Sequence, residues 1–132
     1  MLLQSITIAD QRYHAAKKEV DFIQRYIFPG GSLPSVSVIA KNVADHTDMR
    51  FYQLEDIGQH YATTLARWCD RFFCNIAQIQ KLGYSETFIR MWNFYLCYCE
   101  GGFKENSIGT IQLLLTKPLC RREPALDFKM NL

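Results

Sequence analysis

Residues 58–68 join a strand-like run, Phe51–Ile57, to a long helical pattern, and this junction constrains the fold more than any other feature of the sequence. From Leu65 onward the apolar side chains recur at intervals of three and four, which is the spacing of one helix face. Tyr61 lies where the strand becomes the helix. Because ligands and reacting groups gather at strand ends in open α/β sheets, we expect Tyr61 to face an active site. The helices that follow would wall an apolar pocket.

Two helical patterns follow the junction, and both are rich in aromatic side chains. The first runs to Leu82 and ends at Gly83, and the second begins after Ser85, which can cap it. Aromatic residues make up 14% of the chain. On the sequence alone, two interpretations of these aromatic residues stay open: a protein core, or a pocket for an acyl chain. The residues concerned are Trp68, Phe72, Phe73, Trp92, Phe94, Tyr95 and Tyr98.

Strand and helix patterns alternate along the chain, which predicts an α/β fold. Between the first two strands, apolar spacing predicts one helix over residues 11–27 and a shorter helix after Ser35. The run Ile111–Leu115 is almost continuously apolar, as expected for a strand covered on both faces. The sheet would be thin, with helices on its faces and one bare edge. The predicted strands are Leu2–Ile8, Phe51–Ile57 and Ile108–Thr116.

The length of 132 residues suits one domain or part of one. A strand that starts at residue 2 indicates a chain that begins inside a domain. We expect residues 1–117 to form that portion of a domain and residues 118–132 to form a tail. Neither a signal peptide nor a run of about 20 apolar residues is present, so we expect a cytoplasmic protein. The net charge of +2, without a basic block, argues against a nucleic-acid partner, whereas a peripheral membrane contact stays open.

Several other kinds of chemistry find little support. Glu55 and Asp56 are adjacent on a strand, so their side chains point to opposite faces and cannot act as a pair. No Gly-x-Ser-x-Gly turn accompanies His60. Cys97 and Cys99 point in different directions on a helix. The sequence also lacks the matching pairs of Cys or His ligands that are typical of a structural zinc site. We expect the helical cysteines to be buried free thiols.

Several strings of residues resemble the C-terminal part of the cyclopropane-fatty-acyl-phospholipid synthases and the mycolic acid cyclopropane synthases. The resemblance runs from residue 2 to about residue 117. The strings, in chain order, are Leu3–Ile8, Asp21–Gly31, Leu33–Ser35, His60–Leu65 with Trp68, Arg90–Trp92 with Tyr95 and Leu96, and Gly102–Phe103 with Ile111–Gln112.

This resemblance implies the C-terminal half of a class I, Rossmann-like methyltransferase that uses S-adenosylmethionine. The chain would supply the last three strands, with the final strand antiparallel and central, and a helical lipid-facing insertion. Such enzymes act on the cis double bond of unsaturated acyl phospholipids: methyl transfer gives a carbocation, and loss of a proton to bound bicarbonate closes the ring. Whether the product is a cyclopropane or a methyl branch, and which lipid is used, stay open.

The resemblance also suggests roles for individual residues. Tyr61 would help to hold bicarbonate, Ile6 would contribute backbone there, and Gln4 stands where many members have His. Cys99 matches a cysteine noted as reactive, whose modification would block the site sterically. We expect the acyl substrate to contact Trp68, Phe72, Trp92, Tyr95 and Cys99.

The glycine-rich loop that binds S-adenosylmethionine in this family has no counterpart in the sequence. We therefore expect no cofactor-binding residues here and no activity from this chain alone. The alternative is a non-enzymatic lipid-binding or dimerisation module derived from the fold. Its exposed first strand would pair with a second copy.

Overall fold

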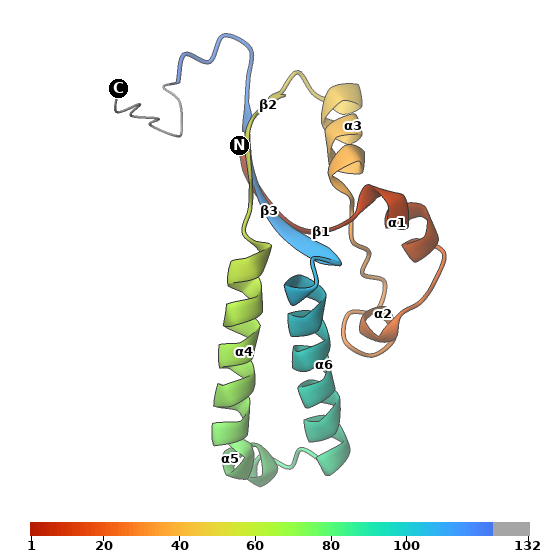
Figure 1. Cartoon of the computed structure of the whole chain (residues 1–132), viewed down its shortest axis with the longest axis vertical. Coiled ribbons are helices and arrows are strands. Elements are labelled where there is room, and N and C mark those ends of the chain that lie inside the picture. Colours follow the sequence, from red (N-terminus) through yellow and green to blue (C-terminus); the bar gives the residue numbers. More distant parts are fainter. Residues whose placement is uncertain (123–132) are drawn as a thin grey trace.

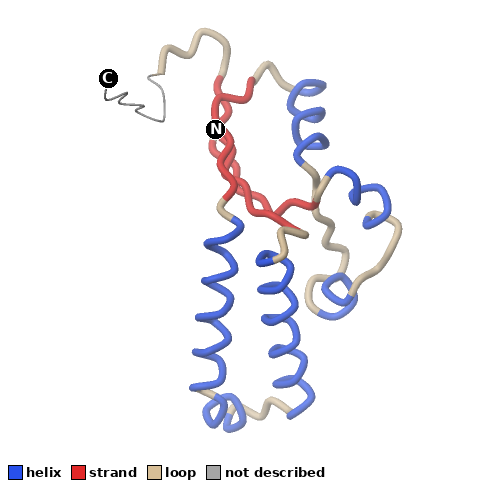
Figure 2. The backbone as a smooth tube through the Cα atoms, viewed as in Figure 1, coloured by secondary structure: helices blue, strands red, loops and turns tan. Residues whose placement is uncertain are grey.

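A computed structural model gives the structure of the chain and describes residues 1–122. Three strands form one sheet, and a long pair of helices extends from one end of that sheet (Figures 1 and 2). In chain order the elements are β1 (Leu2–Ile8), α1 (Asp10–Ala16), α2 (Phe22–Tyr26), α3 (Val36–His46), β2 (Arg50–Asp56), α4 (Gly58–Cys74), α5 (Ile76–Lys81), α6 (Glu86–Lys104) and β3 (Ile108–Thr116).

The sheet has the strand order β1-β3-β2, and β3 runs antiparallel to both neighbours. Ile6 lies opposite Thr110, and Gln4 lies opposite Gln112. The expected α/β class is confirmed, as is the antiparallel, central position of the last strand. The second strand begins and ends one residue earlier than the alternation predicted.

One face of the sheet is covered by α3. Ile111, Leu113 and Leu115 alternate along β3, so they share that face, and all three are buried against α3. Ser35 caps α3, because its Oγ accepts a hydrogen bond from the Val38 N–H at 3.4 Å. Leu114, on the opposite face, is only half-buried. Thr110 and Thr116 share the face of Leu114 and are buried, so the expectation that β3 is covered on both faces holds only in part.

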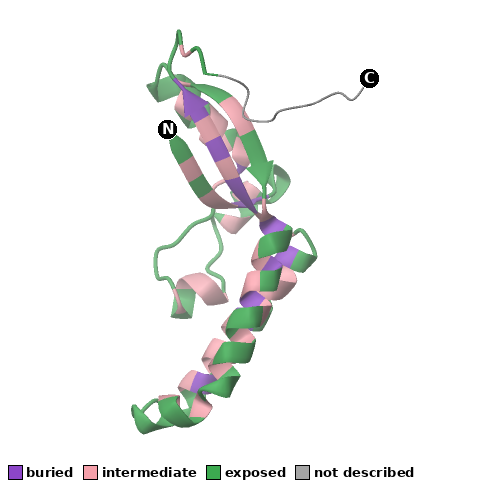
Figure 3. Cartoon of the chain, turned by 90° about the vertical axis from the view of Figure 1, so that its left-hand side faces the viewer, coloured by how far each residue is buried: buried purple, intermediate pink, exposed green. Residues whose placement is uncertain are grey.

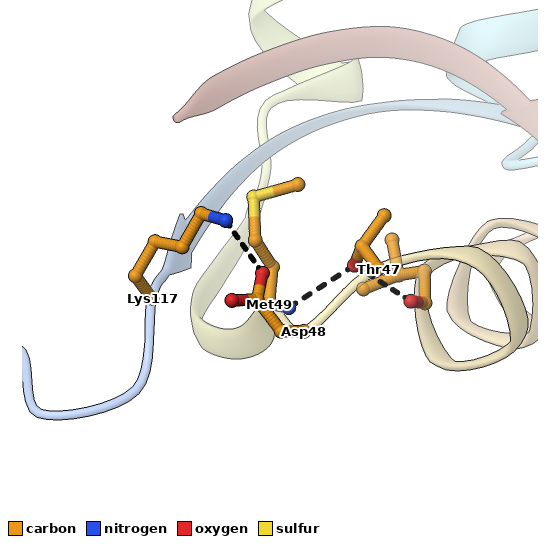
Figure 4. Close-up of polar contacts among 5 residues, drawn as sticks. Thr47, Asp48, Met49 and Lys117 are labelled. Carbon is orange, nitrogen blue, oxygen red and sulfur yellow. Dashed lines mark hydrogen bonds and ion pairs between the residues drawn. The ribbon is translucent and has the colours of Figure 1, made fainter.

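The connection between α3 and β2 is held to the end of β3 (Figure 4). Thr47 Oγ1 donates to the Val43 carbonyl at 2.7 Å and accepts from the Met49 N–H at 3.1 Å. Lys117 Nζ lies 2.7 Å from Asp48 Oδ1, and this hydrogen bond lowers the pKa of Asp48. Both partners are exposed, so the ion pair orients the connection more than it stabilises the fold.

The helical pair is an antiparallel hairpin of α4 and α6, with α5 at its far end (Figure 1). Its core consists of Ala62, Leu65, Leu96 and Phe103. Burial is confined to a few positions along the hairpin, and much of its outer surface is exposed (Figure 3). No helix within residues 1–122 is both long enough and apolar enough to cross a membrane.

Two predicted helices are each divided in two. The helix expected over residues 11–27 is α1 and α2, because Asp21 starts a new helix through a capping box: its carboxylate accepts from the Gln24 N–H at 2.8 Å, and Gln24 Oε1 accepts from the Asp21 N–H. The helix expected to end at Gly83 breaks at Asn75. The Asn75 side chain donates to the Arg71 carbonyl at 2.7 Å and competes with the helical backbone.

Candidate functional site

The junction between β2 and α4 is fixed by close backbone packing. The Ile57 N–H donates to the Thr110 carbonyl at 2.7 Å, and Asp56 Oδ1 accepts from the Gly58 N–H at 2.8 Å. A Cβ atom on Gly109 would lie only 2.8 Å from Asp56 Oδ2, so the Asp56 carboxylate occupies the space that glycine leaves. The first turn of α4 therefore has a defined position at the end of β2.

Tyr61 lies in that first turn, at the strand-to-helix junction where the sequence places it. Its ring is half-buried and lies 5.1 Å from the ring of Phe103. Ile6 and Cys99 pack against the same hairpin core as Tyr61. Three of the predicted site residues, which lie on β1, α4 and α6, are thus brought together.

Burial controls the ionisation of this cluster. It raises the pKa of Cys99 to about 11, and the nearby Asp21 carboxylate adds to the effect. The pKa of Tyr95 is also raised, first by burial and then by its neighbours Cys99 and Tyr61. At neutral pH the Cys99 thiol is therefore protonated, which makes it a poor nucleophile.

An open pocket of about 330 Å³ lies between α4 and α6. This volume lies at the lower end of the range of about 300–1,000 Å³ for small-molecule pockets. Trp68 and Phe72 line it from α4, and Trp92, Tyr95 and Leu96 line it from α6. The pocket thus contains four of the five residues predicted to contact an acyl chain. Cys99 packs against the same core, one helical turn beyond Tyr95.

The aromatic side chains of the hairpin are not a closed core. Phe73, Phe94 and Tyr98 are each about half exposed, at 47%, 51% and 48%, and Trp68 is 44% exposed. Between the two interpretations left open by the sequence, these exposures favour a pocket and an open surface.

Gln4 is bonded to the neighbouring strand β3. It is exposed on β1, and its Oε1 accepts from Gln112 Nε2 at 3.1 Å. It lies on the same strand face as Ile6, because alternate residues of a strand share a face. Ile6 packs against the same hairpin core as Tyr61.

The expectation of buried thiols is wrong for Cys74 and Cys97, which are exposed, whereas Cys69, Cys99 and Cys120 are half-buried. All five are free. Across residues 1–122, no three His, Cys, Asp or Glu side chains are arranged to hold a metal ion.

Sequence reasoning gave no role to three residues near the cluster. Asp21 raises the pKa of Cys99, and the ring of Phe28 lies 6.2 Å from that of Tyr95. Both lie within the string Asp21–Gly31, so the resemblance could have pointed to them. The Thr110 hydroxyl is buried without a hydrogen-bond partner among the described residues. Its position opposite Ile6 depends on strand register, which the sequence does not specify.

Comparison with known proteins identifies the family. The sequence profile described as mycolic acid cyclopropane synthetase matches residues 1–113. The tuberculostearic acid methyltransferase UfaA1 of Mycobacterium tuberculosis is 37% identical over 115 residues, which are 87% of this chain and 27% of that protein. The cyclopropane-fatty-acyl-phospholipid synthase of Escherichia coli K12 is 38% identical over 96 residues, which are 73% of this chain and 24% of that protein.

Comparison with a solved structure supports the same family. The mycolic acid cyclopropane synthase CmaA1 complexed with SAH and CTAB matches with a TM-score of 0.77 and 27% identity, covering 89% of this chain and 44% of that one. The chain belongs to the mycolic acid cyclopropane synthetase family, and the resemblance drawn from its motifs is confirmed. It spans about a quarter of the length of these curated relatives and less than half of the solved structure.

Proposed function

We propose that this chain forms the acyl-binding part of an S-adenosylmethionine-dependent methyltransferase that acts on the cis double bond of unsaturated acyl phospholipids, of the cyclopropane-forming type. The observation that carries the proposal is the pocket between α4 and α6, lined by Trp68, Phe72, Trp92 and Tyr95. Its lining is almost entirely apolar, as an acyl chain requires. The names of the relatives point to the same class of substrate.

The aromatic lining suits the charge that such chemistry develops. A cation near the face of Trp or Tyr is stabilised by the ring quadrupole, by about 0.5–2 kcal/mol. Trp92 and Tyr95 lie with ring centroids 5.0 Å apart in this pocket. They would favour positive charge on an acyl carbon held between the helices.

The described residues do not fit the cofactor. No glycine-rich turn joins a strand to a helix: β1 passes into α1 through Ala9, and the Asp56 carboxylate at the end of β2 is engaged by the Gly58 N–H. Sites for this type of ligand are built on a helix N-terminus after a glycine-rich turn. We therefore derive no step through S-adenosylmethionine and propose that this chain alone neither binds it nor turns over substrate. Isothermal titration with S-adenosylmethionine should show no binding in the micromolar range.

A bicarbonate site at the Tyr61 cluster is part of the same proposal. The support is that Tyr61 and Ile6 pack against the same hairpin core. Tyr61 would contribute its hydroxyl and Ile6 its backbone. Gln4 lies on the same strand face as Ile6, but its carbonyl oxygen is bonded to Gln112.

Acyl binding can be measured with the chain as it is. Its two tryptophans, Trp68 and Trp92, both line the pocket, so their fluorescence reports on it directly. A phospholipid with a brominated acyl chain should quench this fluorescence, and Phe72→Ala should raise the lipid concentration needed. Phe73→Ala, which removes an exposed ring outside the pocket, is the matched control. Unchanged fluorescence, or equal effects of the two variants, would count against the proposal.

We propose that a peripheral membrane contact lies at the far end of the hairpin. Leu82 and Tyr84 are 75% and 49% exposed there, beside Lys81. Apolar and basic side chains together favour anionic bilayers. Leu82→Glu should reduce co-sedimentation with anionic vesicles, whereas Leu119→Glu, at another highly exposed leucine, should not. Equal loss in both variants would argue against this contact.

The alternative function, a non-enzymatic lipid-binding or dimerisation module, has one observation in its favour. Within residues 1–122, β1 pairs with β3 on one side only, so its other edge can accept a strand from a second copy. Sedimentation velocity over a range of concentrations tests this. A stable dimer that retains acyl lipid favours the module, whereas a monomer favours the acyl-binding part of an enzyme.

A further inference from the structure

Two cysteines on facing helices share one hydrogen-bond acceptor. The Cys69 thiol on α4 and the Cys97 thiol on α6 both donate to Asn93 Oδ1, at sulfur–oxygen distances of 3.8 Å and 3.5 Å. Both sulfur atoms therefore lie within 3.8 Å of the same oxygen atom. A disulfide forms only between cysteine side chains that can approach each other. The shared acceptor holds the two thiols near each other, one from each of two packed helices.

We propose that Cys69 and Cys97 are a site of thiol modification, where a disulfide-type oxidant such as oxidised glutathione forms a bond between α4 and α6. Neither the acyl-binding function nor the cofactor enters this proposal, so it stands or fails separately from them.

The exposure of the two thiols sets the order of the steps. Cys97 is exposed, so its thiolate attacks one sulfur of oxidised glutathione, and one glutathione thiolate leaves. Half-buried Cys69 then attacks the Cys97 sulfur of the mixed disulfide, and the second glutathione leaves. The two cysteines lose two protons and two electrons in total, and two glutathione molecules take them up as thiols.

The electrostatics agree with this order. The pKa of Cys69 is raised first by burial and then by Cys97, with smaller effects from Asp70 and Glu100. A thiol with a raised pKa is a slow first nucleophile. It can still react within a mixed disulfide, because the sulfur it attacks is held beside it. The effect of Cys97 on Cys69 is a second sign that the two thiols are neighbours.

Cys99 is a natural comparison, since it lies two residues from Cys97 on the same helix. Its thiol lies near Asp21 and Tyr95 rather than Asn93, and burial raises its pKa to about 11. The helical period directs residues two apart to different sides. Cys99 should therefore stay reduced under conditions that oxidise Cys97.

A disulfide between Cys69 and Cys97 would affect the pocket between α4 and α6. Cys69 follows Trp68, and Cys97 follows Leu96, and both of these neighbours line the pocket between α4 and α6. Joining the two cysteines fixes the separation of the helices that form its walls. The same bond closes a loop that contains α5, which restricts the unfolded chain and should raise the thermal midpoint.

The experiment treats the purified chain with oxidised glutathione and digests it with trypsin under non-reducing conditions. We expect peptide 68–71 joined to peptide 91–104, with the mass of the pair less two hydrogens. The thermal midpoint should rise on oxidation and return after dithiothreitol. Because peptide 91–104 also contains Cys99, fragmentation of the joined peptides must place the bond at Cys97.

Two variants decide the outcome. In Cys97→Ser the joined peptides and the rise in midpoint should both disappear, and in Cys99→Ser both should remain. If the joined peptides survive Cys97→Ser, or if Cys69 stays unmodified while Cys97 keeps glutathione, the proposal is overturned. Cross-links only between separate molecules, seen as dimers on a non-reducing gel, would also overturn it.

Discussion

The ring of Tyr61 lies 5.1 Å from the ring of Phe103 at an interplanar angle of 43°. Tyr61 is in the first turn of α4 and Phe103 in the last turn of α6, so this pair closes the base of the hairpin where it meets the sheet. Phe103 is 1% exposed, which makes it the fixed partner. A candidate catalytic tyrosine is therefore also part of the packing that positions it.

Because the contact with Phe103 involves the ring of Tyr61, the contributions of the ring and the hydroxyl to stability can be measured separately. Tyr61→Ala should lower the free energy of unfolding by about 2 kcal/mol, less than for a fully buried aromatic ring, because Tyr61 is half-buried. Tyr61→Phe should leave stability almost unchanged, because no hydrogen bond joins the hydroxyl to another described residue. Urea unfolding of both variants measures the difference. Equal losses would show that the hydroxyl, not the ring, holds the hairpin.

Alanine substitutions at two glycines, Gly109 and Gly101, should change the stability of the chain in opposite directions. At Gly109 a Cβ would lie 2.8 Å from Asp56 Oδ2, so Gly109→Ala must move the carboxylate and should destabilise the chain by about 1–3 kcal/mol. At Gly101, inside α6, nothing lies within 4 Å of a new Cβ. Gly101→Ala should stabilise by about 0.5–1 kcal/mol through helix propensity alone. Thermal unfolding monitored by circular dichroism compares them, and a neutral Gly109→Ala would contradict the close approach at the junction.

Cys99 should make stability depend on pH in the alkaline range. The folded chain holds the pKa of this thiol at about 11, above its ordinary value of 9.0, so the thiolate is disfavoured in the fold. The resulting stabilisation is fully present below about pH 9 and is lost as pH rises through about 11. Cys99→Ala should flatten this part of the profile. Urea unfolding at several pH values measures the slope, and identical profiles for the variant and the unchanged chain would refute the assignment.

The buried hydroxyl of Thr110 should be dispensable for folding. It has no hydrogen-bond partner among the described residues, so Thr110→Val removes a desolvation penalty and keeps the shape of the side chain. We expect a change between zero and about 1 kcal/mol of stabilisation. Ser35→Ala is the contrast, because it removes the cap of α3 and should cost about 1 kcal/mol. A large loss in Thr110→Val would show that the hydroxyl has a partner.

Much of this arrangement follows from the local pattern of the sequence. The apolar and β-branched residues of Leu2–Ile8 and the apolar run in β3 predict strands that the structure contains with the same bounds. Ser85 caps α6 as its position predicts, through its Oγ and the Phe88 N–H. These features depend on neighbours in the sequence, so periodicity and capping preference suffice to find them.

The rest depends on contacts between distant residues. The apolar spacing of residues 11–27 fits one helix, but Asp21 ends that pattern by capping α2 and placing Phe22 against Phe94, with ring centroids 4.7 Å apart. The exposure of Cys97 depends on which side of α6 faces α4. Spacing alone does not reveal either property, because each is set by an element far away in the chain.

The most direct test of the central claim is photo-crosslinking with an unsaturated phospholipid that carries a diazirine in its acyl chain near the cis double bond. If the hairpin binds the acyl chain, labels should appear in peptides 68–71, 72–81 and 91–104, which carry the residues lining the pocket, and unlabelled lipid should compete. Labels confined to the peptides of the sheet, or labels that excess unlabelled lipid does not reduce, would contradict the claim.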